Sequence, residues 1–120
     1  MTPTILIVSP DEHTREELKK ILAPAFPLIV AEDGAQCLAA LKQKAPIALA
    51  FIGVSADEAT GKLFEEVRTL APKLTVIAVG ESESEDDAIQ AVRRGATGYV
   101  MPPHRPDDIL TLARGVRPSA

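Results

Sequence analysis

The sequence predicts an α/β domain in which helices cover both faces of a parallel β-sheet. Short apolar runs alternate with helix-like stretches along all 120 residues, which favours strand–helix–strand units in one domain of ordinary size. The runs are continuous and rich in Ile and Val, as is typical of strands buried on both faces. The expected strands are Thr4–Val8, Leu28–Ala31, Ile47–Ile52, Thr75–Val79 and Thr97–Met101.

A stretch with helical spacing of apolar residues follows each expected strand. Residues about 3.6 positions apart share one face of a helix, so these residues are the predicted contacts with the sheet. They are Leu18, Ile21 and Leu22 after the first strand; Cys37, Leu38 and Leu41 after the second; Leu63, Phe64, Val67 and Leu70 after the third; Ile89 and Val92 after the fourth; and Ile109, Leu112, Ala113 and Val116 after the fifth.

Turn and capping residues mark the limits of these helices. Pro24 and Pro27 end the first helix, because proline interrupts helical hydrogen bonding. Asp33-Gly34 marks the turn into the second helix, and Gly95 takes a C′-like position after the fourth. Pro106-Asp107-Asp108 starts the fifth helix, with proline in the first turn and acids near its positive end.

Composition excludes several classes of protein. The net charge of −4 argues against nucleic-acid binding, which needs a basic surface, although arginines collect late in the chain. The single cysteine excludes an internal disulfide and favours the cytoplasm. No apolar run approaches the roughly 18 residues that span a membrane, and no signal peptide is recognisable.

The carboxyl ends of the strands are the expected place for chemistry in a sheet of this kind. These ends carry Ser9-Pro10, Gly53, Gly80 and Pro102-Pro103. None of them offers a carboxylate, an amine or an imidazole at the strand tip. The sequence therefore predicts a scaffold suited to a reaction from which the reactive groups are missing.

The segment Ser9-Pro10-Asp11-Glu12 has two readings. Asp11 and Glu12 form a carboxylate pair of the kind that holds Mg²⁺. The segment also reads as a helix start, with Ser9 as N-cap, Pro10 as the first helical residue and Glu12 as the return partner. A cap at Asp11 would serve the same helix start. We favour the helix start over the metal site, because no nearby carboxylates complete a metal site.

Other candidate groups have plain structural explanations. Asp57 follows the third strand at a distance and reads as a turn or cap residue. The acidic segment 81–87 reads as a solvated loop and helix start. Cys37 lies on an apolar helical face and is expected to be a buried, inert thiol. His13 and His104 show no ligand spacing and are expected to be exposed.

The chain resembles the receiver domains of two-component response regulators over essentially its whole length. Five features carry the resemblance: Ile5-Leu6-Ile7-Val8 followed by an acidic turn and Arg15, Ala31-Glu32-Asp33-Gly34, Gly61-Lys62-Leu63, the stretch from Ala91 to Val100, and Pro103. The resemblance implies phosphoryl transfer to an aspartate, assisted by Mg²⁺, a hydroxyl and a lysine. Placed on this chain, the acid pair falls on Ser9 and Pro10, the aspartate on Gly53, the hydroxyl on Gly80 and the lysine on Pro102.

We therefore expect a flavodoxin-like (βα)5 three-layer sandwich with a parallel five-stranded sheet of order 2-1-3-4-5 and right-handed crossovers. Residues 1–120 form one receiver-like domain, with 117–120 as a tail or the start of a linker. The expected function is that of a degenerate receiver, or pseudo-receiver, in a phosphorelay. It is a phosphorylation-independent protein-interaction module in the cytoplasm, and not an enzyme.

No cofactor and no Mg²⁺ binding are expected. The expected partners are proteins of a bacterial-type signalling pathway, with neither nucleic acid nor membrane bound. By resemblance, the interaction face, which also serves a possible homodimer, lies on the fourth helix, fifth strand and fifth helix, near Arg93, Arg94, Tyr99 and Arg105. Two alternatives stay open: a phosphoacceptor with displaced acids (Asp11, Glu12 and Asp57), and a small-ligand site in the crevice that the missing side chains leave.

Overall fold

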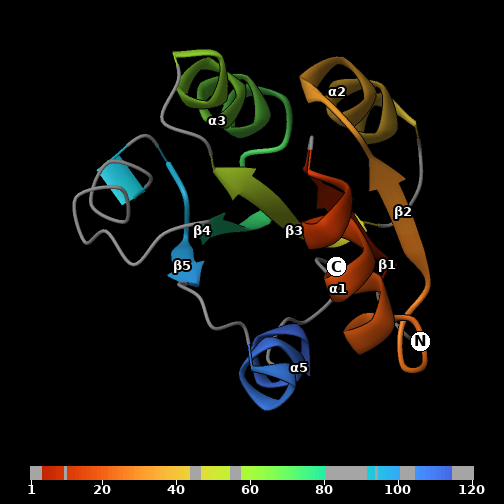
Figure 1. Ribbon diagram of the computed structural model, residues 1–120. Coiled ribbons are helices and arrows are strands. Elements are labelled where there is room, and N and C mark those ends of the chain that lie inside the picture. Colours follow the sequence, from red (N-terminus) through yellow and green to blue (C-terminus); the bar gives the residue numbers. More distant parts are fainter. Residues whose placement is uncertain are drawn as a thin grey trace.

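The computed structural model describes residues 4–9, 11–43, 47–54, 58–80, 92–93, 95–100 and 105–114. Five parallel strands form one sheet in the order β2-β1-β3-β4-β5, which confirms the predicted order (Figure 1). In chain order the elements are β1 (Thr4–Val8), α1 (Glu12–Leu22), β2 (Leu28–Ala31), α2 (Gly34–Lys42), β3 (Ile47–Val54), α3 (Glu58–Leu70), β4 (Thr75–Gly80), β5 (Gly98–Val100) and α5 (Pro106–Arg114).

Two hydrophobic clusters, one on each face of the sheet, form the core. Successive side chains of a strand point to opposite faces, so Leu6 joins the cluster under α2 and α3, while Ile5 and Ile7 join the cluster under α1 and α5. Figure 1 shows these two helix pairs on opposite sides of the sheet. Burial on both faces is the physical reason that the strand sequences are continuously apolar.

Three strands differ in length from the prediction. β4 ends at Gly80 rather than Val79. β3 continues through Val54 because its pairing with β4 extends to Gly53↔Val79 and Val54↔Gly80, so Gly53 lies inside the strand rather than after it. β5 begins at Gly98, one residue later than predicted. Thr97 still ties it to β4, since its N–H donates to the Val76 carbonyl over 2.7 Å and its hydroxyl accepts from the Val76 N–H over 3.2 Å. Met101 lies outside the described residues.

The predicted helix limits are confirmed at three places. The Asp33 carboxylate accepts from the Gln36 N–H over 2.9 Å at the start of α2. Gly95 has a φ of +120°, a backbone conformation in which a Cβ would be strained. α5 begins at Pro106. Of the expected fourth helix, residues 92–93 are described and are helical, and Ile89 lies outside the described residues.

Three residues that the periodicity placed in the core are exposed instead. Leu70, Leu112 and Val92 keep 41%, 37% and 51% of their surface. Leu70 is the last residue of α3, where the helix leaves the sheet. In α5, Ile109 and Ala113 face the sheet, which puts Leu112 at the flank of that helix. Helical spacing finds the apolar face but not where the sheet beneath it ends.

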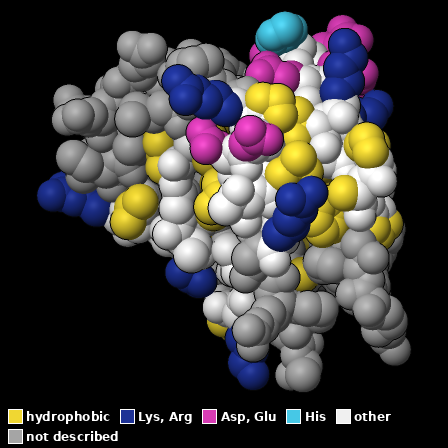
Figure 2. All heavy atoms as spheres, turned by 90° about the horizontal axis from the view of Figure 1, so that it is seen from below, with side chains coloured by type: hydrophobic (Ala, Val, Ile, Leu, Met, Phe, Trp, Pro, Cys, Tyr) yellow, Lys and Arg dark blue, Asp and Glu magenta, His cyan; other side chains and the backbone are white. Residues whose placement is uncertain are grey.

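The face over α1 and α5 is mixed in character. Hydrophobic side chains lie there among charged side chains of both signs (Figure 2). None of the helices in the described part of the chain is long and apolar enough to cross a membrane.

The contrast between buried and exposed leucines gives a test of this packing. Leu18→Ala removes a side chain that is 1% exposed in α1 and should lower the free energy of unfolding by about 2–5 kcal/mol. The same change at Leu70 should cost less than about 1 kcal/mol, because that side chain is already largely hydrated. Urea denaturation followed by circular dichroism measures both. Equal losses would contradict the described core.

Candidate functional site

The carboxyl ends of β1, β3 and β4 lie side by side and form the candidate site. Val8 pairs with Ile52, and Val54 pairs with Gly80, so Ser9 follows β1 next to Gly53 of β3. The Ser9 N–H donates to the Ala31 carbonyl over 3.1 Å, which continues the pairing of β1 with β2 past the end of the strand. Ser9 is completely buried.

The Ser9 hydroxyl fills the space beside Gly53. A Cβ added to Gly53 would lie 2.8 Å from Ser9 Oγ and 3.0 Å from Ser9 Cβ, closer than side-chain atoms pack without a shift. The hydroxyl is also held from the chain beyond it, because Ser9 Oγ accepts from the Asp11 N–H over 3.1 Å. The two residues are complementary: one has no side chain, and its neighbour occupies that volume.

Asp11 caps α1, which confirms the alternative form of the predicted helix start, and Ser9 is not the cap. The Asp11 carboxylate accepts from the Thr14 N–H over 3.2 Å and from the Thr14 hydroxyl over 2.6 Å. The helix therefore begins at Glu12, two residues later than a cap at Ser9 would put it. Hydrogen bonding to Thr14, chiefly from its hydroxyl, lowers the pKa of the Asp11 carboxyl below its ordinary value.

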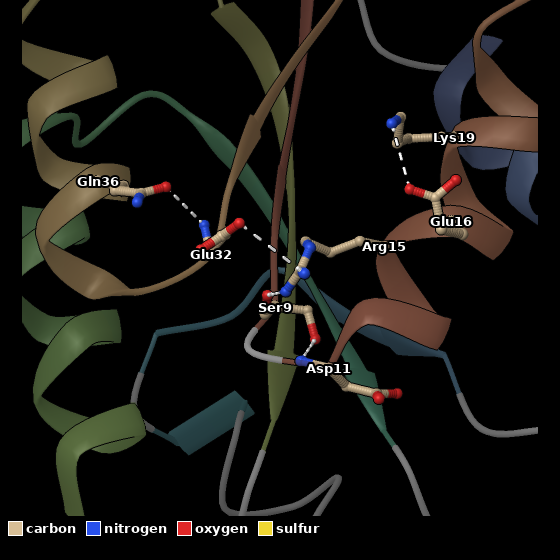
Figure 3. A network of polar contacts seen from close by, with 7 residues as sticks. All are labelled: Ser9, Asp11, Arg15, Glu16, Lys19, Glu32 and Gln36. Carbon is tan, nitrogen blue, oxygen red and sulfur yellow. Dashed lines mark hydrogen bonds and ion pairs between the residues drawn. The ribbon is translucent and has the colours of Figure 1, made fainter.

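Arg15 places a positive charge at this end of the sheet. Its Nη1 donates to the Ser9 carbonyl over 2.7 Å, and its Nη2 lies 4.0 Å from the Glu32 carboxylate (Figure 3). The Arg15 side chain is 14% exposed, while that of Glu32 is largely in solvent. The guanidinium thus joins the start of α1 to the end of β1 and lies near the turn after β2. The sequence pointed to Arg15 only through the resemblance, because a single arginine on a helix carries no signal of its partner.

A second complementary pair lies at the end of β4. Tyr99 pairs with Ala78 across the β4–β5 ladder, so Gly80 is its diagonal neighbour on the same face of the sheet. The Tyr99 ring packs against the cluster under α2 and α3, and its hydroxyl oxygen is buried. A Cβ on Gly80 would overlap the Tyr99 hydroxyl and Cζ and would lie 3.0 Å from Cε1.

The remaining predicted residues fall into three groups. Glu12 is exposed in the first turn of α1, and His13 is exposed and lies 3.7 Å from Glu17. Arg93 and Arg105 are exposed. The third group, which lies outside the described residues, comprises Pro10, Asp57, Arg94, Pro102, Pro103 and His104.

Two structural expectations can be compared with the described residues directly. Cys37 is fully buried in α2, and burial raises the pKa of its thiol to about 11, so the thiolate is disfavoured as predicted. Among the residues that the structure describes, no three His, Cys, Asp or Glu side chains are grouped so that they could hold a metal ion. The described oxygen groups near the strand ends do not fit a Mg²⁺ site, because the Asp11 carboxylate is turned to Thr14.

The strand order and the position of the site identify the class of protein. A doubly wound parallel sheet with strand order 2-1-3-4-5 is flavodoxin-like, and its functional residues lie at the carboxyl ends of the strands. The chain belongs to the response regulator receiver domain family, whose family model matches residues 5–114. It is thus a receiver domain of two-component response regulators, a class that works through contacts with partner proteins.

Solved structures of receiver domains are similar over nearly the whole chain. A response regulator from Thermotoga maritima is 26% identical, with 95% of this chain and 96% of that one covered and a TM-score of 0.84. The receiver domain of NtrX from Brucella abortus is 25% identical, with 92% and 94% covered and a TM-score of 0.82. The BeF3-activated DrrB receiver domain is 16% identical, with 95% and 96% covered and a TM-score of 0.82, and shows the fold alone. A search of curated proteins gave no match.

Arg15→Met tests whether Arg15 acts as a clamp, that is, whether its hydrogen bond to the Ser9 carbonyl holds the start of α1 to the end of β1. It removes a hydrogen bond from a charged donor to the Ser9 carbonyl, and should lower the free energy of unfolding by about 1.5–3 kcal/mol. The matched control is Lys19→Met in the same helix, where the lysine makes an exposed ion pair with Glu16 at 3.3 Å. That pair should contribute about 0–1 kcal/mol. Urea denaturation compares the two variants, and an equal effect would show that Arg15 is not a clamp.

Thr14→Val tests the cause of the lowered pKa of Asp11. Losing the hydroxyl donor should raise the Asp11 pKa towards its ordinary value, which NMR titration of the carboxyl carbon measures. Because the folded pKa is lowered, the stabilisation from ionised Asp11 is present above about pH 4 and is lost as the pH falls through the folded pKa. The advantage of the wild type over Asp11→Asn should therefore shrink on acidification. An unchanged pKa in Thr14→Val would assign the shift to another group.

Proposed function

We propose that this receiver domain takes up no phosphoryl group at the usual position and transmits its signal through protein contacts alone. It has no catalytic activity of its own in this proposal, binds no Mg²⁺, and works in the cytoplasm. The single cysteine, which permits no internal disulfide, supports that location. The observation that carries the proposal is the pair formed by Ser9 and Gly53.

The pair of Ser9 and Gly53 leaves no nucleophile for phosphoryl transfer at position 53. Phosphoryl transfer needs a nucleophile placed within bonding reach of the donor and in line with the leaving group. Gly53 has no side chain that could act as the nucleophile. The Ser9 hydroxyl occupies the volume in which the Cβ of such a side chain would lie. Ser9 itself is a poor substitute, because it is completely buried and its oxygen accepts from the Asp11 N–H.

Charge at the site bears on the metal. A divalent cation needs several oxygen ligands with negative charge among them. The Arg15 guanidinium at the Ser9 carbonyl repels a cation there, the Asp11 carboxylate is engaged by Thr14, and the Glu32 carboxylate lies 4.0 Å from that guanidinium. These contacts weigh against the displaced set of Asp11, Glu12 and Asp57 as well as against the usual one.

The two glycines also weigh against a small-ligand site between the strand ends. The volumes that side chains at positions 53 and 80 would enter are taken by Ser9 and Tyr99, so neither glycine leaves an empty place for a ligand next to its Cα. The exposed residues Val92, Arg93 and Arg105 support a protein contact near β5, which as part of this proposal also serves a homodimer. Tyr99 contributes its ring to the core, so its hydroxyl is turned away from such a partner.

Exposure to phosphodonors tests the proposal. Incubation with Mg²⁺ and a small phosphodonor should give no adduct by intact mass, and beryllofluoride should leave the melting temperature unchanged. The DrrB receiver domain, which is described as activated by BeF3, is the positive control under the same conditions. A stoichiometric phosphoryl adduct would overturn the proposal. If labelling occurred and Asp57→Asn abolished it, the displaced set of acids would be the site.

A further inference from the structure

Tyr99 lies in a volume that exists only because residue 80 is glycine. The overlap of its hydroxyl and Cζ with a Cβ at Gly80 is much larger than that of any other contact found for a Cβ at Gly34, Gly53, Gly95 or Gly98. The Tyr99 ring stands diagonally across the β4–β5 ladder from Gly80, on the face covered by α2 and α3. Its hydroxyl oxygen is buried there.

The backbone does not explain the glycine. Gly80 is paired with Val54 in a regular parallel ladder, and Gly95 is the residue with positive φ among the described glycines. Any residue could therefore adopt the backbone conformation at position 80 without strain. The constraint on this position is space, and the group that occupies the space is the tyrosine.

We propose that Gly80 and Tyr99 form a steric lock that holds the tyrosine in one inward position. A side chain at residue 80 would displace the ring from this position, because its Cβ would overlap the Tyr99 hydroxyl and Cζ. Glycine removes that competitor, so in this proposal the inward position is the stable one for this chain. The surface around β5 is then constant, since no event at the strand ends changes the direction of Tyr99.

This inference stands independently of whether the chain is phosphorylated. It rests on packing between β4 and β5, and the phosphodonor experiment does not bear on it. Position 80 is the determinant, and the predicted order of effect follows side-chain size. Alanine lifts the tip of the ring, and threonine excludes the ring from the site.

Tyr99 is its own reporter, because the chain contains one tyrosine and no tryptophan. Quenching of its fluorescence by acrylamide and iodide should be weak in the wild type. It should rise severalfold through the series Gly80→Ala, Gly80→Ser and Gly80→Thr, towards that of a free tyrosine amide. Gly98→Ala is the matched control on β5, since its Cβ would meet the flexible end of Ile77 at 3.2 Å, and adjacent residues of a strand point to opposite faces of the sheet. It should leave quenching at the wild-type level.

A second measurement decides the case in which a Gly80 variant folds poorly. Gly80→Ala should lower the melting temperature in the wild-type background and have little effect in a Tyr99→Ala background, where the overlapping ring is absent. The lock is overturned if the tyrosine stays shielded in a folded Gly80→Thr variant. It is also overturned if Gly80→Ala lowers the melting temperature equally in both backgrounds, since that result would mean that the glycine is needed for another reason.

Discussion

The parallel register of the central strands is the constraint on which this site depends. It places Ser9 beside Gly53 and Gly80 diagonal to Tyr99, so that each glycine faces a side chain that needs its empty volume. Interiors pack at near-crystalline density, and a missing side chain must be matched by a neighbour or leave a void that costs stability. Here the match comes from two different strands, which makes the closed ends of the sheet a property of the fold rather than of one residue.

Charge at the site follows the same logic. A cluster of carboxylates would repel itself and would need a cation to hold it together. In the described part of this site the Asp11 carboxylate is bound by Thr14, and the positive charge comes from Arg15, which hydrogen-bonds the Ser9 carbonyl and lies 4.0 Å from the Glu32 carboxylate. The end of β1 is thus held by groups within the chain. This arrangement is that of a structural junction, and it is consistent with a receiver fold that serves as a binding surface.

The proposed lock between Gly80 and Tyr99 has one consequence for signalling. A two-state element responds to a ligand only if the ligand binds its two states differently. If Tyr99 has one position, the region near β5 has no second state for the strand ends to select. Under the proposal, partner recognition would then depend on the side chains exposed near β5, such as Arg93 and Arg105.

The sequence by itself determined the layers and most helix limits, and its resemblance to receiver domains predicted the strand order. Continuous Ile- and Val-rich runs, the cap at Asp33, the positive φ of Gly95 and Pro106 at the start of α5 all report local backbone or burial preferences that the structure confirms. The sequence also marked Ser9, Gly53 and Gly80 as the residues at the strand ends. Each of these signals comes from residues that are close together along the chain, so the amino-acid sequence alone shows them.

Only the tertiary structure decided what those residues do. That Asp11 rather than Ser9 caps α1, that β3 runs on through Gly53, and that Leu70 and Leu112 are exposed depend on where neighbouring elements begin and end. The sequence showed two glycines at the strand ends, and their missing side chains suggested an empty crevice between those ends. The register between strands filled both places, with Ser9 and Tyr99, because the distance between residues 9 and 53, or 80 and 99, is set by pairing across the sheet and not by spacing along the chain.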